Sequence, residues 1–408
     1  MDARQLARVR RRLERFAGEV FEPISRRDQR AWGVEYLRGL MLDGRRKSIQ
    51  PMAERLGVDH QGLSQFVNQS TWSAVDVRRQ LAVRVERQLD PEFVVVDDSG
   101  LPKQGHASVG VARQYCGALG KRANCQVGVS VNLATETVGC AVNWRLFLPE
   151  QWDSDTERRA RCGVPDDVRH LPKWQLALDA IDELGEWGID LNERPVLADA
   201  GYGEITAFRS GLEDRELSYI VEVKRSTTAH AADIEPVTEA YGGRGRPPVP
   251  HYPPHSTLEK LAAALPPRAW KRCTWRNGSK GKLRSRFAAI PVRPANRSIE
   301  RDPETGELPV RLLLVQWPDD AEAPTKYWLS NLPAETNLTE LARIAKARWR
   351  IEQDYRELKD ALGLDHFEGR SWNGWHHHVT LVSAAHAFLT LERQDPKAPA
   401  PISAYSKS

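Results

Sequence analysis

The feature that most constrains the fold is a pair of segments in which apolar and other residues alternate strictly. The first segment covers residues 125–133 and the second covers residues 138–148. Alternation with a period of two places the apolar side chains of a strand on one face. Only Ala-Thr-Glu-Thr separates the two segments. The pattern therefore predicts an antiparallel hairpin with one buried face.

The elements around this hairpin predict a mixed α/β domain. A short buried strand at 93–96 precedes the hairpin and ends at Asp97-Asp98-Ser99-Gly100. An amphipathic helix at 172–187, a strand at 195–198, a helix near 205–215 and a strand at 218–223 follow it. The order of three strands, helix, strand, helix and strand matches the ribonuclease-H-like core, which is a mixed sheet with helices on its faces.

The rest of the chain predicts an insertion and a helical ending. A segment rich in Gly and Pro at 241–255 is followed by candidate strands at 283–292, 309–317 and 326–330. Helical patterning resumes at Leu338, runs to about Lys359 and returns at about 377–391. The β-rich part predicts an insertion into the core, and the later helices predict its completion.

The N-terminal ninety residues carry most of the net positive charge. They hold 18 Lys and Arg against 12 Asp and Glu, whereas the remaining residues hold 41 against 43. A basic unit before a near-neutral body predicts a surface that binds nucleic acid. The alternative is a solvated helical surface.

Within this basic unit, residues 48–70 have the layout of a helix-turn-helix. Two short apolar helical faces flank Gly57, which can supply the turn. The second helix would point four side chains outward that can reach base edges, namely Gln61, Ser64, Gln65 and Asn68. An ordinary helical hairpin is the alternative.

Composition excludes several classes of protein. No apolar run approaches the roughly 18 residues of a membrane span, and the N-terminus lacks the apolar stretch of a signal peptide. Five cysteines outside C-x-x-C pairs argue against a disulfide scaffold or a zinc ribbon, so we expect a cytoplasmic protein. We expect Cys116 and Cys125 to be buried small residues rather than ligands.

Acidic residues at strand ends are candidate metal ligands. Asp97 and Asp98 follow one predicted strand, and Asp199 follows another. Carboxylate oxygens suit Mg²⁺, and a third acid would complete a site for two ions. The alternative for a single aspartate at a strand end is a cap or turn residue.

A third acid lies in the charged segment 347–360. If this segment is one α-helix, Arg348, Glu352 and Lys359 lie along one stripe. An acid between two cations suits a metal ligand beside groups that bind phosphate. The alternative is a surface helix with ion pairs between successive turns.

At these residues the chain resembles a known family. The segments that carry the resemblance are V-V-V-D-D-S-G-L-P-K-Q-G, G-V-A-R-Q-Y-C-G-A-L-G-K-R-A-N-C-Q-V, V-L-A-D-A-G-Y-G and R-W-R-I-E-Q-D-Y-R-E-L-K-D-A-L-G-L-D-H-F-E-G-R-S-W. They resemble bacterial insertion-sequence transposases of the DDE class with the Y-R-E-K signature, the IS-four-like superfamily. Within it the chain looks closest to the IS-seven-zero-one branch. Ala345 stands where the signature has tyrosine.

The resemblance implies a metal-dependent cut-and-paste transposase. Its catalytic and metal-binding acids would be Asp98, Asp199 and Glu352, with Asp97 as the alternative to Asp98. They would bind two Mg²⁺ ions, or Mn²⁺. Arg348 and Lys359 would hold phosphates.

The resemblance also implies the partners and the location. The partners would be double-stranded DNA at terminal inverted repeats and a target site, with a homodimer in the synaptic complex and no membrane. The protein would act in the bacterial cytoplasm at the nucleoid.

Further residues near the first acid are candidate DNA contacts. These are Lys103, Arg113, Lys121 and Arg122, for which solvated loop charge is the alternative. We expect the adjacent His376, His377 and His378 not to share one metal ion, because neighbouring helical side chains diverge. Trp328 is the nearest candidate for an aromatic that stacks on a flipped base, with core packing as its alternative.

The predicted domain organisation follows from these elements. It comprises a helical DNA-binding domain at 1–90, a first part of the ribonuclease-H-like core at 91–225, a β-rich insertion at 226–335, a helical completion at 336–393 and a disordered tail at 394–408. Two other functions remain open, a catalytically silent DNA-binding regulator and a ribonuclease-H-like structure-specific nuclease.

Overall fold

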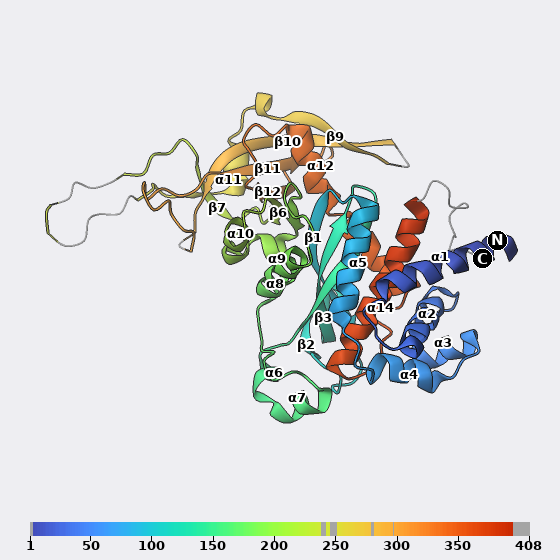
Figure 1. Ribbon diagram of the computed structural model, residues 1–408. Coiled ribbons are helices and arrows are strands. Elements are labelled where there is room, and N and C mark those ends of the chain that lie inside the picture. The colour runs from blue at the N-terminus through green and yellow to red at the C-terminus, as the bar shows by residue number, and fades with distance from the viewer. Residues whose placement is uncertain (1–2, 238–241, 245–250, 279–280, 297, 395–408) are drawn as a thin grey trace. The chain divides into compact units, whose positions relative to one another are not determined.

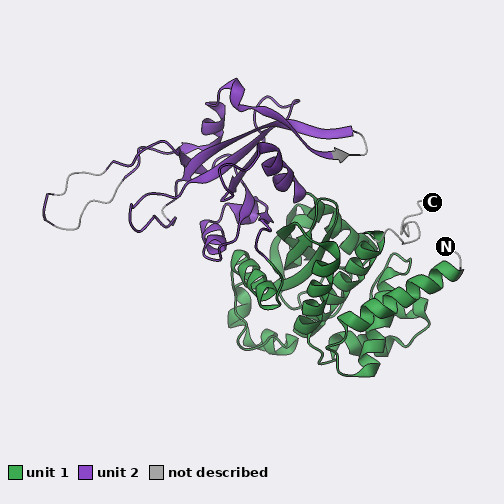
Figure 2. Ribbon diagram, turned by 45° about the horizontal axis from the view of Figure 1, so that its top comes forward, with its two compact units in different colours: residues 1–190, 349–408 green, residues 191–348 purple. Residues whose placement is uncertain are grey.

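The computed structural model describes residues 3–237, 242–244, 251–278, 281–296 and 298–394. The chain forms two compact units, shown in different colours in Figure 2. Unit 1 comprises residues 1–190 and 349–408, and unit 2 comprises residues 191–348. The predicted disordered tail lies outside the described residues apart from Gln394, and the predicted loop at 241–255 lies partly outside them.

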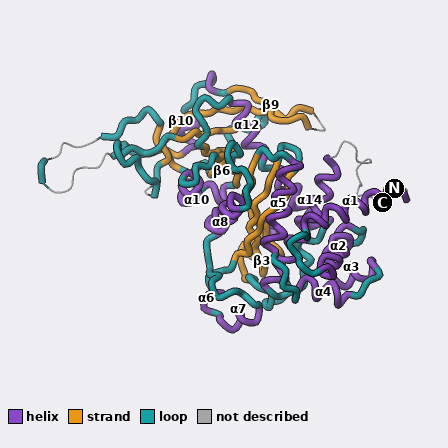
Figure 3. The backbone as a smooth tube through the Cα atoms, in the orientation of Figure 1, coloured by secondary structure: helices purple, strands orange, loops and turns teal. Residues whose placement is uncertain are grey.

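Five helices begin unit 1 (Figures 1 and 3). They are α1 (Ala3–Val20), α2 (Arg27–Met41), α3 (Ile49–Leu56), α4 (His60–Asn68) and α5 (Ala74–Leu89). Gly57 ends α3 in the left-handed conformation at φ 69°, and the Asp59 side chain caps α4 by accepting from Gln61 N and Gly62 N. The two helices and the turn that the sequence predicts at 48–70 are present.

The sheet of unit 1 is antiparallel. Its strands are β1 (Phe93–Pro102), β2 (Ala112–Cys116), β3 (Lys121–Ala134) and β4 (Gly139–Phe147). Strand β3 pairs with β1, with β2 and with β4. The predicted end of the first strand at Asp97 is wrong, because β1 continues six residues to Pro102 with Lys121–Ala134 as its partner.

The hairpin of β3 and β4 is buried on both faces, whereas the sequence predicts one buried face. Nearly every residue of β4, and of β3 from Cys125 onward, is buried, so both faces are covered rather than one. Helix α8 (Lys173–Glu186) contacts both strands, and α14 (Trp372–Gln394) contacts β4. Polar residues such as Ser130 and Asn132 therefore face protein rather than water.

Helix α14 is buried around almost its whole circumference, as expected of a helix in the middle of a unit. It contacts α1, α2, α4 and α5 as well as β4. The three adjacent histidines belong to this burial. Both ring nitrogens of His377 lie 2.8 Å from backbone oxygens, of Val67 and Trp72, and His378 Nδ1 lies 2.9 Å from the Tyr36 hydroxyl. Burial lowers the pKa of His378 to about 3. The expectation that the three side chains diverge agrees with these contacts.

Unit 2 contains a mixed sheet in the order β5-β6-β12-β11-β10-β7-β8, with β9 also on β10. Among the strand pairs of unit 2 that the structure describes, β5 (Val196–Ala198) and β6 (Tyr219–Val223) are parallel and the others are antiparallel. The other strands are β7 (Thr228–Ala231), β8 (Ser256–Thr257), β9 (Lys271–Gly278), β10 (Gly281–Pro294), β11 (Arg311–Trp317) and β12 (Lys326–Ser330). The predicted strands at 283–292, 309–317 and 326–330 are confirmed as β10, β11 and β12. The coarse prediction of a mixed α/β fold is also confirmed.

Short helices complete both units. Unit 2 holds α9 (Ala200–Gly203), α10 (Thr206–Glu213), α11 (Leu258–Ala263), η2 (Pro267–Ala269) and α12 (Leu338–Ala347), and unit 1 holds η1 (Gly117–Leu119), α6 (Gln151–Ser154) and α7 (Thr156–Cys162). Within the described residues no helix is both long enough and apolar enough to cross a membrane.

The charged segment 338–359 is not one continuous helix. Helix α12 ends at Ala347, a turn follows, and α13 begins at Arg350 and ends at Arg356. A π-helical turn, η3 (Glu357–Ala361), then widens the coil. The single regular α-helix on which the predicted stripe depends is therefore wrong, because Arg348 lies in the turn, Glu352 in α13 and Lys359 in η3.

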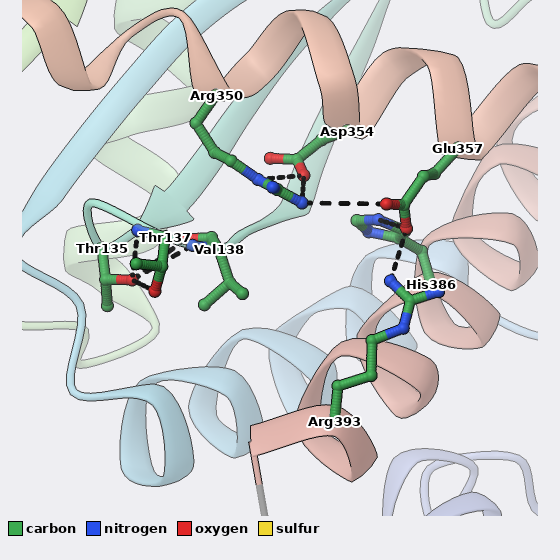
Figure 4. Close-up of polar contacts among 8 residues, drawn as sticks. All are labelled: Thr135, Thr137, Val138, Arg350, Asp354, Glu357, His386 and Arg393. Atoms are coloured by element: carbon green, nitrogen blue, oxygen red, sulfur yellow. Dashed lines mark hydrogen bonds and ion pairs between the residues drawn. The ribbon is translucent and has the colours of Figure 1, made fainter. Parts of the chain in front are cut away.

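A chain of charged side chains, some buried and some partly exposed, links α13 and η3 to α14 (Figure 4). Arg350 Nη2 lies 2.8 Å from Asp354 Oδ1, and Arg393 Nη1 donates to Glu357 Oε2 at 2.6 Å. His386 Nε2 lies 3.7 Å from the same Glu357 oxygen. Asp354 is 1% exposed, and a Cβ on Gly139 would come within 2.5 Å of its Oδ2. These contacts fix the rotation of α13 about its own axis.

We expect Gly203→Ala to destabilise unit 2. A Cβ at Gly203 in α9 would overlap the backbone oxygen of Glu222 in β6, and backbone cannot move aside as a flexible side chain can. The free energy of unfolding should fall by about 1–3 kcal/mol, measured by urea denaturation. Gly18→Ala in α1 is the control, because its Cβ meets open space in a helix and should stabilise by about 0.5–1 kcal/mol. Equal stability of Gly203→Ala and wild type would contradict the close approach.

We expect the stabilisation by Glu357 to depend on pH. His386, and then Arg393, lower the pKa of Glu357 to about 2 from 4.5. A carboxyl with a lowered pKa stabilises the folded state above pH 4.5, and this contribution is lost as the pH falls towards 2. Glu357→Gln should lose about 1–2 kcal/mol at pH 7, after allowance for its partial exposure, and progressively less below pH 4.5. Urea denaturation from pH 3 to 7 measures this, and a loss independent of pH would contradict it.

Candidate active site

The first pair of acids lies in the middle of β1, where successive side chains point to opposite faces of the sheet. Asp97 pairs with Ser130 and Asp98 pairs with Val129 across the β1–β3 ladder. Directly opposite residues share a face. Asp97 therefore lies on the face of Ser130, and Asp98 lies on the other face.

Helix α13 packs on the face of Asp97. The Ser130 hydroxyl lies 2.7 Å from the hydroxyl of Tyr355 in α13. Glu352 lies three residues earlier in the same helix and is exposed, whereas Tyr355 is buried. Asp97 and the helix that carries Glu352 therefore share one face of the unit 1 sheet.

Asp98 has a partner that the sequence does not suggest. Lys173 Nζ donates to Asp98 Oδ2 at 2.6 Å from the first turn of α8. The Asp98 side chain is 24% exposed, and that of Lys173 is 43% exposed. Lys173 follows Pro172 at a helix start, and no motif in the sequence marks it as part of a site.

Lys359 reaches the same strand from η3. Its Nζ donates to the backbone oxygen of Gly100 at 3.1 Å, two residues after Asp98 in β1. Burial lowers the pKa of Lys359. A half-buried ammonium group thus contacts β1 at Gly100, a residue that is close in sequence to both aspartates.

Asp199 lies in unit 2, immediately after β5. It is the N-cap of α9, and its Oδ1 accepts from Gly201 N at 2.9 Å. Arg348 Nη2, at the end of α12, lies 3.6 Å from its Oδ2. The Asp199 side chain remains 38% exposed. Unit 2 therefore brings together two predicted residues, Asp199 and Arg348.

The donor atoms of these residues suit a divalent cation. Carboxylate oxygens are the ligands that Mg²⁺ prefers, and Asp98, Asp199 and Glu352 are all accessible to solvent to some degree. In neither unit do the described residues gather three His, Cys, Asp or Glu side chains closely enough to hold a metal ion. The residue types fit, and the assembled site stays a prediction.

The basic candidates near the first acid divide by exposure. Arg113, Lys121 and Arg122 are exposed on β2 and β3, and the ladder pairs β2 with β3. Lys103 instead points inward, where its Nζ donates to the backbone oxygen of Phe367 at 2.5 Å and burial lowers its pKa to about 8. Three of the four basic side chains are therefore at the surface, where an anionic ligand can contact them.

Helix α4 presents only part of its predicted outward face. Gln61 and Gln65 are exposed, whereas Ser64 and Asn68 are partly buried. A Cβ on Gly374 would lie 2.8 Å from Asn68 Oδ1, because α4 packs against α14. The expectation that Asn68 points outward is wrong for this reason.

Other candidate residues are buried. All five cysteines are buried and free, as the sequence predicts for Cys116 and Cys125. Trp328 in β12 is 4% exposed, with Lys346 Nζ 6.0 Å from its ring centre, and Ala345 is also buried. These positions pack in the core of their units.

Sequence analysis missed the residues that hold the site elements in place. Lys173, Ser130 and Tyr355 lie in apolar or charged patterns that any helix or strand shows. The one available signal was the run of charges from Arg350 to Lys359, which favoured surface ion pairs instead.

Comparison with known proteins gives the family. The model of the DDE superfamily endonuclease family matches residues 19–282. The chain is 31% identical over 205 residues to the probable transposase for insertion sequence element IS701 of Microchaete diplosiphon, over 48% of this chain and 49% of that relative. The chain thus spans about half the length of this relative. The resemblance to the IS701 branch is confirmed.

A solved structure is similar to this chain, with low sequence identity and a low TM-score. The piggyBac transposase in a synaptic complex with hairpin DNA aligns with 90% of this chain and 66% of its own, at 10% identity and a TM-score of 0.42. Values this low do not establish a common fold. Because the family match extends over more than half of the residues and includes both candidate aspartate positions, the chain belongs to the DDE superfamily endonucleases.

Proposed function

We propose that the chain is an insertion-sequence transposase that cuts DNA at terminal inverted repeats and joins it to a target by phosphoryl transfer. The observation that carries the proposal is the endonuclease family match over residues 19–282, which contains Asp97, Asp98 and Asp199. Glu352 lies outside the matched residues, and its role depends on the R-x3-E-x6-K spacing and on the position of α13.

The finer fold follows the same proposal. We assign residues 91–225 and 336–393 to a ribonuclease-H-like core, 226–335 to a β-rich insertion and 1–90 to a helical DNA-binding domain. The antiparallel β1, β3 and β4 in unit 1 and the parallel β5 and β6 in unit 2 are the strand types that this core requires. The helices α3 and α4 support the DNA-binding assignment.

The acids would hold the metal. Two Mg²⁺ ions, or Mn²⁺, would be bound by Asp199, Glu352 and one aspartate of β1, and would supply activation of the attacking oxygen and stabilisation of the leaving one. Arg348, at 3.6 Å from Asp199, would hold a phosphate beside this carboxylate. Lys359 would place its ammonium group at β1, and Arg113, Lys121 and Arg122 would bind phosphates further along the DNA.

The register supports Asp97 as the ligand from β1, although the family resemblance favours Asp98. Asp97 lies on the face of Ser130, against which α13 packs. Asp98 lies on the opposite face and is held by Lys173. A metal ligand has to face the other ligands, whereas an aspartate in an ion pair can instead stabilise α8 against β1.

Duplex DNA at the inverted repeats would be the partner, and synapsis of two ends would require two copies of the chain. A regulator without activity would bind the same ends and leave them uncut. A structure-specific nuclease would cut without needing element ends and would not join strands.

We expect Glu352→Gln and Asp199→Ala to abolish cleavage. The loss of a residue that only orients a metal ligand costs about 10–100-fold, so the loss of a ligand should cost at least as much. Purified protein, Mg²⁺ and a labelled duplex with the ends of the element measure nicking at the element boundary. Glu340→Gln is the matched control, because Glu340 pairs with Arg343 on the neighbouring helix α12 and should leave cleavage intact.

The outcomes separate the three functions. Nicking at the boundary followed by strand transfer, both lost in the two variants, supports the transposase. Specific binding of ends with no nicking by the wild type supports the regulator. Cleavage without dependence on element ends and without strand transfer supports the nuclease.

We expect Asp97→Asn to lose cleavage as Glu352→Gln does, and Asp98→Asn to keep a measurable rate. The reason is that Asp97 faces α13 and Asp98 faces α8. Nicking rates at saturating Mg²⁺ measure the difference. A rate lost in Asp98→Asn and retained in Asp97→Asn would assign Asp98, as the sequence favours.

A further inference from the structure

Helix α1 carries six arginines among its 18 residues, and four of them form one exposed row. We propose that this row, Arg4, Arg8, Arg11 and Arg15, binds the phosphate backbone of duplex DNA; the proposal rests on the proposed function. We call it the arginine row. Most of α1 precedes residue 19, where the family match begins, so the match assigns no role to these residues.

The spacing of four, three and four residues aligns the row along the helix. At about 100° per residue, the four side chains point within about 60° of one another. The opposite side of α1 is apolar, and Leu13, Phe16 and Val20 on it are buried. Since α1 contacts α2, α5 and α14, the row faces away from the core of unit 1.

The charge of the row is not balanced locally. Among the described residues, no ion pair joins any of its four arginines to a carboxylate. The nearby Glu19 is already engaged by Arg84 and Arg87 of α5. Burial, and then the charges of Arg87 and Arg15, lower the pKa of Arg84. Guanidinium groups thus crowd around Glu19 at this end of α1, and an anionic ligand would relieve their repulsion.

The length of the row suits a nucleic-acid strand. Eleven residues at 1.5 Å rise span about 16 Å, and neighbouring members have Cβ atoms about 5–6 Å apart. Each strand of duplex DNA carries one charge per about 3.4 Å of helix axis, so a row of this length parallel to the axis spans about five phosphates of one strand. Arginine can donate two parallel hydrogen bonds to a phosphate group.

Other anionic partners fit less well. An acidic protein partner would need an apolar centre in its interface, and the row has no large apolar residue within it. A membrane-surface helix inserts its apolar face into the bilayer, whereas the apolar face of α1 is buried in unit 1. A straight, evenly spaced polyanion fits the row best.

The test measures how DNA affinity depends on salt. Each phosphate contact contributes about 0.9 to the slope of log K against log salt for duplex DNA. Replacement of all four arginines by glutamine should lower the slope by up to about 3.6, and Arg8→Gln alone by about 0.9. Glutamine has a helix propensity close to that of arginine, so α1 should persist, which circular dichroism checks.

Matched variants on the same helix separate position from charge. Arg10 is exposed but points about 130° away from the centre of the row, so Arg10→Gln should leave the slope unchanged. Arg8→Lys keeps the charge and should keep the slope. Fluorescence anisotropy of the full chain with a labelled duplex of the element ends, from 50 to 300 mM salt (about the range in which such slopes are measured), gives all values.

Each outcome decides the proposal. Slopes that fall for the row and not for Arg10→Gln support it. An unchanged slope in the fourfold variant, with wild type still binding DNA, overturns it and leaves the proposed function intact. Failure of the wild type to bind duplex DNA at any salt overturns the proposed function as well. If the fourfold variant unfolds, Arg8→Gln against Arg10→Gln decides alone.

Discussion

The burial of α14 is the constraint on which the rest of unit 1 depends. This helix contacts β4, α5 and the N-terminal helices, and it supplies His386 and Arg393 to the charged chain that holds α13. Two of its histidines, His377 and His378, lie within hydrogen-bond distance of backbone oxygens and of the Tyr36 hydroxyl in the N-terminal helices. A helix close to the end of the chain therefore fixes the positions of both the N-terminal helices and the helix that carries Glu352.

The sequence predicts the elements of the fold better than their surroundings. Period-two alternation locates β3 and β4, and Gly57 locates the end of α3, because these signals are local. The hairpin of β3 and β4 is buried on both faces because α8 and α14 cover it. The alternation of residues within the two strands predicts one buried face only, since it carries no information about these two helices. Likewise, the π-helical turn that begins at Glu357 contacts α14 through His386, and the pattern of charged residues does not predict the turn.

The candidate site shows the same division between local and distant information. Positions at predicted strand ends make the Asp97-Asp98 step and Asp199 candidates, and the spacing to Arg348 and Lys359 makes Glu352 a candidate. The resemblance favours Asp98 over Asp97, but a strand places these two neighbours on opposite faces, and the sequence does not show which helix covers each face. The Ser130–Tyr355 contact and the Lys173–Asp98 ion pair carry that information, and each joins residues far apart in sequence.

The basic residues of unit 1 fall into two groups, those whose side chains bind other parts of the protein and those exposed to solvent, which can bind an anion. Lys103 and Lys359 donate hydrogen bonds to backbone oxygens, and burial lowers the pKa of each. Their ammonium groups therefore bind backbone around β1 rather than a ligand at the surface. Arg84 and Arg87 hold Glu19 and fasten α1 to α5. Among the described residues, the arginine row on the outer side of α1 takes part in no ion pair of this kind. Because guanidinium groups remain charged at any physiological pH, their uncompensated field extends into solvent, where a polyanion gains most from it.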